Sequence, residues 1–301
     1  MNRSPSRLAA AALLFAIMAG AALAPLYARF VSRTDPFRST PMALVAGRPV
    51  LADNPGTGGT PGLGVTPIGP AWRAPYLLGA DNLGRDVAAR LLYGGRLSLG
   101  VAAAATALSL LGGTLAGALA GFAGGLVDKI ISALIDLLWA FPVYLLAISL
   151  SIVLVNEGLH LGPLTLEADN PLLPILIIGL VYVPYVARPV RAEMIALQSQ
   201  DYVEAAIATG GTRLHLLRRH LLPALRPTLA SLLPILAAMA LLTEAALSIL
   251  GLGIQPPAAS WGTLLADGQS LLYTRPLVAL APGLAIATTV LSLNLLTDRT
   301  P

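Results

Sequence analysis

The sequence of 301 residues is 56% hydrophobic and only 11% charged, and its mean hydropathy is +0.76. Because about 25% of the residues of a soluble domain are charged, this composition excludes an ordinary soluble protein and predicts an all-α polytopic membrane protein. The net charge of +4 comes from 19 basic residues, all arginine except Lys129, against 15 acids. This balance suits anionic lipid surfaces, and no interleaving of aromatic and basic residues points to nucleic acid. The lack of cysteine excludes disulfides and thiolate sites.

The first apolar segment, residues 8–26, is uncharged and follows a basic start. It is long enough to cross about 30 Å of hydrocarbon. Ala22-Leu23-Ala24 resembles a signal-peptidase site, but Pro25 follows directly and should hinder cleavage. We therefore expect residues 1–30 to form an uncleaved N-terminal transmembrane helix.

The composition then changes to proline, glycine, threonine and asparagine. Residues 31–76 are predicted to form an irregular periplasmic loop, because such a stretch buries little apolar surface. In the block 77–100 that follows, Asp81 and Asn82 are expected to cap an interfacial amphipathic helix.

Five further apolar segments complete a prediction of six transmembrane helices. These segments are 97–127, 130–156, 170–187, 227–250 and 276–297. Short segments predicted to lie inside hold most of the basic residues, including the group Arg213, Arg218, Arg219 and Arg226. By the positive-inside rule, both termini are expected to be cytoplasmic.

Two features of these segments predict packing rather than chemistry. Glycines recur at every fourth position of the second span, which predicts a groove for a closely packed helix. These glycines are Gly113, Gly117, Gly121 and Gly125. Between the fifth and sixth spans, residues 251–268 are predicted to form a turn-rich outer segment, with Trp261 as an anchor at the membrane interface.

Two acids, Asp136 and Glu244, fall inside the predicted spans. A carboxylate at the centre of the hydrocarbon costs about 2.5–3.5 kcal/mol on insertion scales, so both are expected to face protein, water or the interface. For Asp136 we expect an ion pair with Lys129. Glu244 is either a functional group or the acceptor of a structural hydrogen bond from a neighbouring helix.

The segment 201–223, DYVEAAIATGGTRLHLLRRHLLP, is the only long basic and polar stretch between two strongly apolar ones. It is predicted to form a short helix, a glycine break and a second helix. Gly210 and Gly211 permit a tight reversal, because glycine has no Cβ to forbid positive φ. We expect a cytoplasmic loop that presents a small helix to a partner.

The spacing of this segment carries a resemblance. Glu204-Ala205-Ala206, then three residues, Gly210 and finally Leu222-Pro223 resemble the EAA loop of ABC importer permeases. Other segments in the same order are LGRD (83–86), LLYGGRLSL (91–99), the span from Asp136 to AFP (140–142), EAALSILGLG (244–253) and QPPAASWG (255–262). Together they resemble the inner-membrane permease subunits of the dipeptide, oligopeptide and nickel class of ABC importers.

This resemblance implies an ABC type I importer permease fold, with a core over residues 77–297 and the EAA loop at 201–223. The implied function is half of a translocation path for peptides or a related small solute such as nickel, in the cytoplasmic membrane of a bacterium or archaeon. The implied partners are a second permease in a heterodimer, two ATPase subunits that bind ATP and Mg, and a solute-binding protein outside. The implied ATPase-coupling residues are Glu204, Ala205, Ala206, Gly210, Leu222 and Pro223.

Several catalytic motifs are absent from the sequence. A P-loop needs Gly-Lys-Ser/Thr, whereas Lys129 lies between Asp128 and Ile130. There is no HExxH motif, and Arg96 stands where a GxSxG elbow around Ser98 would need its first glycine. We expect no catalytic residue, no metal site and no ATP site in this chain. Two other readings remain: an ion-coupled secondary transporter or channel with Asp136 and Glu244 as proton carriers, and a membrane anchor without transport activity.

Overall fold

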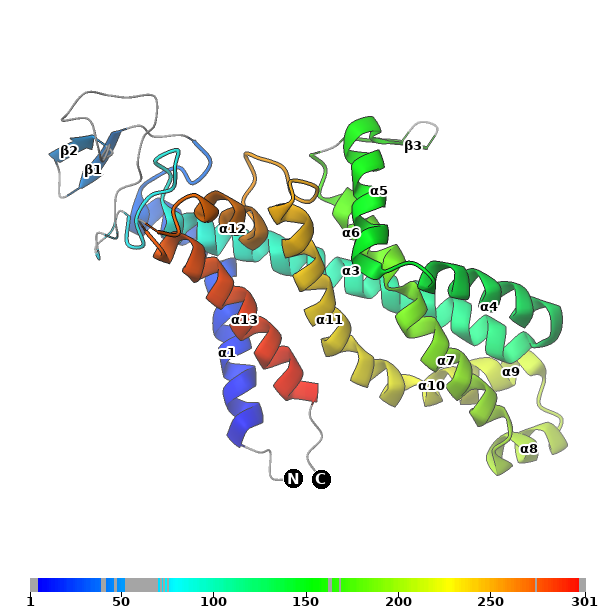
Figure 1. Cartoon of the computed structure of the whole chain (residues 1–301). Coiled ribbons are helices and arrows are strands. Elements are labelled where there is room, and N and C mark those ends of the chain that lie inside the picture. Colours follow the sequence, from blue (N-terminus) through cyan, green and yellow to red (C-terminus); the bar gives the residue numbers. More distant parts are fainter. Residues whose placement is uncertain are drawn as a thin grey trace.

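The computed structural model describes residues 5–38, 42–45, 48–51, 70, 72, 74, 76–161, 164–167, 169–273 and 275–297. Its body is helical, and two short hairpins lie outside this body (Figure 1). The all-α architecture predicted from composition is therefore confirmed.

Three long helices and three bent helix pairs have the length and apolar composition to cross a membrane. The long helices are α3 (Val87–Ala123), α11 (Arg226–Ile249) and α13 (Leu277–Thr297). The bent pairs are α1 (Pro5–Ala22) with α2 (Ala24–Leu26) and η1 (Tyr27–Ser32), α4 (Gly125–Trp139) with α5 (Val143–Glu157), and α6 (Leu172–Val181) with α7 (Val183–Gln198). If each bent pair is one span, the total is the predicted six.

The third span differs from its prediction, because it is broken. Helices α4 and α5 meet at 87° across residues 140–142, where a continuous helix over 130–156 was expected. Pro142 explains the break, since proline lacks the N–H of the helical ladder and its ring clashes with the carbonyl four residues earlier. Pro142 instead takes an extended conformation and precedes the first turn of α5.

The second span also begins earlier than predicted. Helix α3 runs without interruption from Val87, so the separate amphipathic helix expected in block 77–100 is the first part of α3. Its cap is Asp86, whose carboxylate accepts hydrogen bonds from the backbone N–H groups of Ala88 and Ala89. The expected caps, Asp81 and Asn82, lie in the preceding turn.

The predicted glycine groove is confirmed, and its partner is α7. A Cβ added to Gly117 would overlap the carbonyl oxygen of Ala187, and a Cβ on Gly113 or Gly121 would also overlap atoms of α7. Gly125 was wrongly assigned to this groove. It begins α4 with φ of +56°, and a Cβ there would meet nothing, because the chain reverses before it.

A short helix, α12 (Trp261–Gln269), follows α11 where a turn-rich segment was expected. Ser260 and Thr263 form a capping box at its start. The side chain of Trp261 is only 2% exposed. Its backbone N–H donates to Ser98 Oγ and its indole N–H donates to the carbonyl of Leu91, each at 3.0 Å. Trp261 therefore fixes α12 to α3, and the expectation of an interface anchor was wrong.

Charged side chains, three of them buried, join the turn before α3 and the first turn of α3 to α12. The guanidinium of Arg85 lies 2.6 Å from Asp81 and 3.1 Å from Asp267, and Arg90 contacts the same two acids at 3.4 Å. Burial raises the pKa of Asp267, while the positive charges of Arg90 and Arg85 oppose the rise. These ion pairs hold two distant segments of the chain together.

The two hairpins are β1 (Met42–Val45) with β2 (Arg48–Leu51) and β3 (Leu159–Leu161) with β4 (Leu164–Leu166). The first lies inside segment 31–76, so that segment is not irregular throughout. Residues 52–69 lie outside the described part of the chain. In Figure 1 the hairpins and α12 lie at one end of the molecule, here called the hairpin end. The first turn of α1, the last turn of α13 and helix α8 (Asp201–Ala208) lie at the other, here called the α8 end.

Candidate functional site

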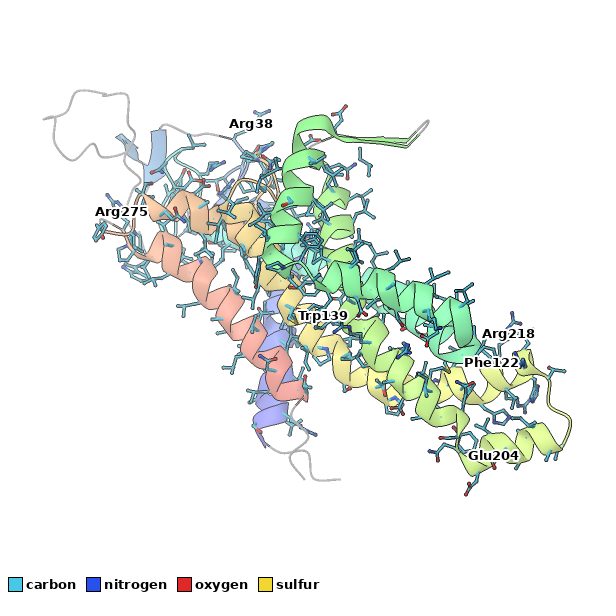
Figure 2. The ribbon with its side chains drawn as sticks, turned by 45° about the vertical axis from the view of Figure 1, so that its right-hand side comes forward. Arg38, Phe122, Trp139, Glu204, Arg218 and Arg275 are labelled. Atoms are coloured by element: carbon cyan, nitrogen blue, oxygen red, sulfur yellow. The ribbon has the colours of Figure 1, made fainter. Side chains whose placement is uncertain are left out.

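The EAA loop, residues 201–223, forms the short helix, break and second helix that its sequence predicts. Helix α8 is followed by α9 (Arg213–Leu216), η2 (Leu217–Leu221) and α10 (Leu222–Ala224). Only two residues separate the end of α7 from the start of α8. Figure 2 shows Glu204 on α8 at the opposite end of the molecule from Arg275. The loop is thus a small projecting unit attached directly to a candidate membrane span.

Both glycines of the break have a structural reason. Gly210 has φ of +87°, and its N–H donates to the carbonyl of Ile207. The N–H of Gly211 donates to the carbonyl of Ala206 at 3.0 Å, which completes a Schellman motif. A Cβ on Gly211 would lie 2.6 Å from that carbonyl oxygen, whereas a Cβ on Gly210 would meet nothing. Gly210 is needed for its backbone conformation and Gly211 for the close approach.

Helix α8 buries one face and exposes another. Val203 is only 2% exposed and belongs to the main core. Glu204 and Ala205 are exposed, and Ala206 is half-buried. The expected coupling residues of α8 are therefore brought together on its outer side, beside the exposed Gly210.

Leu222 and Pro223 are placed elsewhere. They lie in α10, directly before α11 and not on α8. Leu222 is 37% exposed and Pro223 is half-buried. Proline stands in the first turn of α10, where its missing N–H costs nothing. Their position suits a connection into the next span.

Sequence reasoning missed the apolar part of this surface. Tyr202 and Ile207 on α8 are 44% and 55% exposed, and Leu214 on α9 is 55% exposed. Large exposed apolar side chains outside the candidate spans are typical of a contact surface. The sequence did offer a signal: the short helix carries large apolar residues at positions that do not pack into the core.

The acid Asp136 has a different partner from the one expected. It forms an ion pair of 2.6 Å with Arg188 on α7, not with Lys129. Lys129 is two turns earlier on the same helix, about 10 Å away along its axis, while α7 lies alongside. A second ion pair joins the same two helices, since Arg191 donates to Asp128 at 2.6 Å.

The acid Glu244 is fully buried in α11. Its Oε1 accepts a hydrogen bond of 2.8 Å from Ser248 Oγ, one turn later on the same helix. Ser248 Oγ also accepts from the backbone N–H of Ile254. The second carboxylate oxygen, Oε2, is buried and has no hydrogen bond to the described residues. Glu244 therefore organises the chain that leaves α11 toward α12, which fits the structural alternative.

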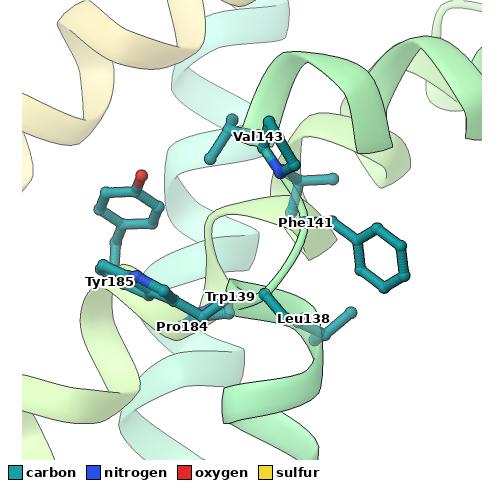
Figure 3. A pocket seen from close by; sticks show the side chains of 9 residues that line it. Leu138, Trp139, Phe141, Val143, Pro184 and Tyr185 are labelled. Atoms are coloured by element: carbon teal, nitrogen blue, oxygen red, sulfur yellow. The ribbon is translucent and has the colours of Figure 1, made fainter.

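The α4–α5 break and the α6–α7 break border one pocket of about 350 Å³ (Figure 3). The rings of Trp139 on α4 and Tyr185 on α7 lie side by side, with centroids 4.4 Å apart. Arg188 lies over the Trp139 ring at 4.2 Å. Tyr182 contacts Tyr185 and forms a hydrogen bond of 2.7 Å with Thr243 on α11. Among the described residues, no cluster of three or more His, Asp or Glu side chains has metal-site geometry.

Comparison of the sequence with known proteins shows which family the chain belongs to. Residues 113–300 match the family described as binding-protein-dependent transport system inner membrane component. A Brucella suis biovar 1 protein, provisionally named a peptide transport system permease, is 37% identical over 74% of this chain and 71% of its own length. The dipeptide transport system permease protein of Alkalihalophilus pseudofirmus is 35% identical over 75% of this chain and 70% of its own length.

One further relative agrees with this placement, and a solved structure shares the fold. The glutathione transport system permease protein of Pectobacterium atrosepticum is 35% identical over 74% of this chain and 70% of its own length. The fold is similar to an inward-facing MetNI methionine ABC transporter, with a TM-score of 0.54 and 17% identity over 67% of this chain and 91% of that one. The chain belongs to the family of binding-protein-dependent transport system inner membrane components, the permease subunits of ABC importers.

Proposed function

We propose that the chain forms half of the translocation path of an ATP-driven importer of peptides or a related small solute such as nickel. The observation that carries this proposal is α8, a projecting helix with exposed Glu204, Ala205 and Ile207, attached to a membrane span by two residues. Relatives named for peptide, dipeptide and glutathione transport support peptides as the solute.

The partners proposed are a second permease in a heterodimer, two cytoplasmic ATPase subunits and a solute-binding protein. The ATPases would hold ATP and Mg and would dock on α8, while the binding protein would dock at the hairpin end. Both chain termini are proposed to be cytoplasmic, because α1 begins and α13 ends at the α8 end (Figure 1). The coupling residues are proposed to be Glu204, Ala205, Ala206 and Gly210, with Leu222 and Pro223 connecting α8 and α9 to α11.

Movement of α8 would be passed to the membrane spans through α7. The glycine groove fixes α7 to α3, and the pairs Asp128–Arg191 and Asp136–Arg188 fix it to α4. These helices would therefore move together when the ATPases close, which would alternate access to the path.

The ion-driven alternative receives no support from the comparisons. The two residues that this alternative needs as proton carriers both have protein partners. Asp136 is in an ion pair and Glu244 accepts a hydrogen bond. The ion pair supports a structural role for Asp136, and the hydrogen bond from Ser248 supports one for Glu244.

Uptake by the reconstituted complex tests the proposal. Vesicles that contain the complex, its binding protein and a radiolabelled dipeptide should accumulate peptide only when ATP is supplied on the ATPase side. An ionophore that dissipates ion gradients should leave this uptake unchanged. Peptide uptake that needs no ATP and stops with the ionophore would instead establish the ion-driven transporter.

A further inference from the structure

The Asp136–Arg188 pair has an exposed side. The side chain of Asp136 is 64% exposed and that of Arg188 is 43% exposed. Both belong to bent pairs that qualify as membrane spans. Charged side chains within a span face a water-filled cavity or protein rather than lipid. The exposed side of this ion pair is therefore expected to face water or a neighbouring subunit rather than lipid.

The pair lies beside two helix breaks. Arg188 is six positions after the break at Tyr182, and Asp136 is four positions before the break at 140–142. Broken spans are where many transporters bind their solutes, because irregular backbone within a membrane is tolerated where it lines a cavity. Residues at both breaks line one pocket.

The pocket beside the pair has aromatic walls. Trp139 and Tyr185 form one wall, and the Arg188 guanidinium covers the Trp139 ring. In Figure 3 the ring of Phe141 points away from Trp139 and Tyr185, which leaves the space between the breaks open. The volume of about 350 Å³ is at the lower end of the ~300–1,000 Å³ range of small-molecule pockets. A dipeptide-sized solute suits it. The lining residues carry no charge, so the ionic contacts come from the adjoining pair, in which Arg188 lies against Trp139 and Asp136 is bonded to Arg188.

We propose that this pocket is a transit site for short zwitterionic peptides, an inference that rests on the proposed importer function. Arg188 receives the terminal carboxylate of the peptide, Asp136 receives its terminal ammonium, and Trp139 with Tyr185 contacts an apolar side chain. Arginine suits this role because its planar guanidinium binds carboxylate with two parallel hydrogen bonds. In the peptide-free chain the two charges neutralise each other. Peptide binding exchanges one ion pair for two and leaves no charge unpaired.

Cysteine protection tests the site directly, because the chain has no native cysteine. Ala140 lines the pocket and is exposed, so Ala140→Cys in the complete complex should react with a hydrophilic thiol reagent. The dipeptide Leu-Phe, at ten times its half-protecting concentration, should slow that reaction about tenfold. Ala133→Cys is the control: Ala133 is exposed on the same helix but does not line the pocket, and the dipeptide should not protect it.

The charged contact has its own matched control. In the Ala140→Cys background, Arg188→Gln should raise the half-protecting concentration of Leu-Phe on the order of tenfold. With Arg188 present, Leu-Phe should protect the cysteine at a lower concentration than its C-terminal amide does. Arg188→Gln should abolish this preference. Arg191→Gln removes the other ion pair between α4 and α7, so it should leave both properties unchanged.

Three results overturn the proposal. The first is labelling of Ala140→Cys that Leu-Phe does not slow, or no labelling at all, while the wild-type complex still imports the dipeptide with ATP. The second is an equal effect of Arg188→Gln and Arg191→Gln, which would make the pair purely structural. The third is a wild-type complex with no ATP-driven peptide uptake, which would overturn the proposed function as well.

Discussion

At the scale of single residues, Gly210 is the position where the EAA loop depends most on backbone conformation. Its φ of +87° is in the left-handed region, where a residue with a Cβ costs about 1–2 kcal/mol. Gly210→Val should distort the turn after α8 and should abolish ATP-driven uptake, whereas Gly210→Asn should retain more uptake because asparagine tolerates this region.

Gly251 supplies the control for that experiment. It has φ of +72° and equally open surroundings, but it lies after α11, away from the EAA loop. Gly251→Val should therefore retain coupling between ATP hydrolysis and uptake. Full uptake by Gly210→Val would contradict the role given to this turn.

Glu244 gives a second prediction at this scale. Glu244→Ala removes the acceptor of the Ser248 hydroxyl, and a buried group left without its partner costs about 1–3 kcal/mol. Glu244→Gln keeps an oxygen in that place, so it should lower the free energy of unfolding by less. The midpoint of thermal unfolding of the purified complex measures the effect of each substitution. A folded Glu244→Gln variant that has lost all uptake would favour a proton-carrying role instead.

The residues that sequence analysis misjudged share one cause. Trp261 was expected at the membrane interface, and Asp136 was expected to bind Lys129. Their actual partners, Ser98 and Arg188, are more than fifty positions away in the chain. Local spacing predicted Gly210 well because its hydrogen bonds stay within the turn.

At the scale of elements, the packing of α3 on α7 depends on the absence of a Cβ. Gly117→Ala should push the two helices apart, because its methyl group would overlap the carbonyl of Ala187. We expect a loss of about 1–3 kcal/mol and a lower unfolding midpoint in detergent. Gly100→Ala is the matched control on the same helix, since its Cβ would meet nothing. Equal unfolding midpoints for the two variants would show that the groove contributes little.

Helices were predictable where apolar runs are long, and their breaks were not. The apolar runs predicted six spans, which correspond to the three long helices and the three bent pairs. The four-residue glycine repeat predicted the groove. The 87° break at 140–142 was missed because a proline in an apolar run is compatible with a kink, a break or a tolerated bend. The helices packed around the proline, here α6 and α7, decide which of these three outcomes occurs.

At the scale of the whole molecule, the arrangement separates two ends. The projecting α8 and the hairpin end lie on opposite sides of the six candidate spans, as Figures 1 and 2 show. The sequence predicted the order of these parts, but it held no information on which helix packs beside which. The line of contacts from α4 through Trp139, Tyr185 and Tyr182 to Thr243 on α11 became visible only in three dimensions.

The most direct test of the central claim is to purify the chain from its native membrane in mild detergent and to identify the ATPase subunits that accompany it. Glu204→Ala/Gly210→Val alters the outer side of α8 and its turn. Glu167→Ala/Gly251→Val makes the same two substitutions at an exposed acid and an open glycine outside the EAA loop. We predict that the ATPases accompany the wild type and the control and are lost from the α8 variant. Equal recovery of ATPase subunits with all three chains, or with none, would contradict the account.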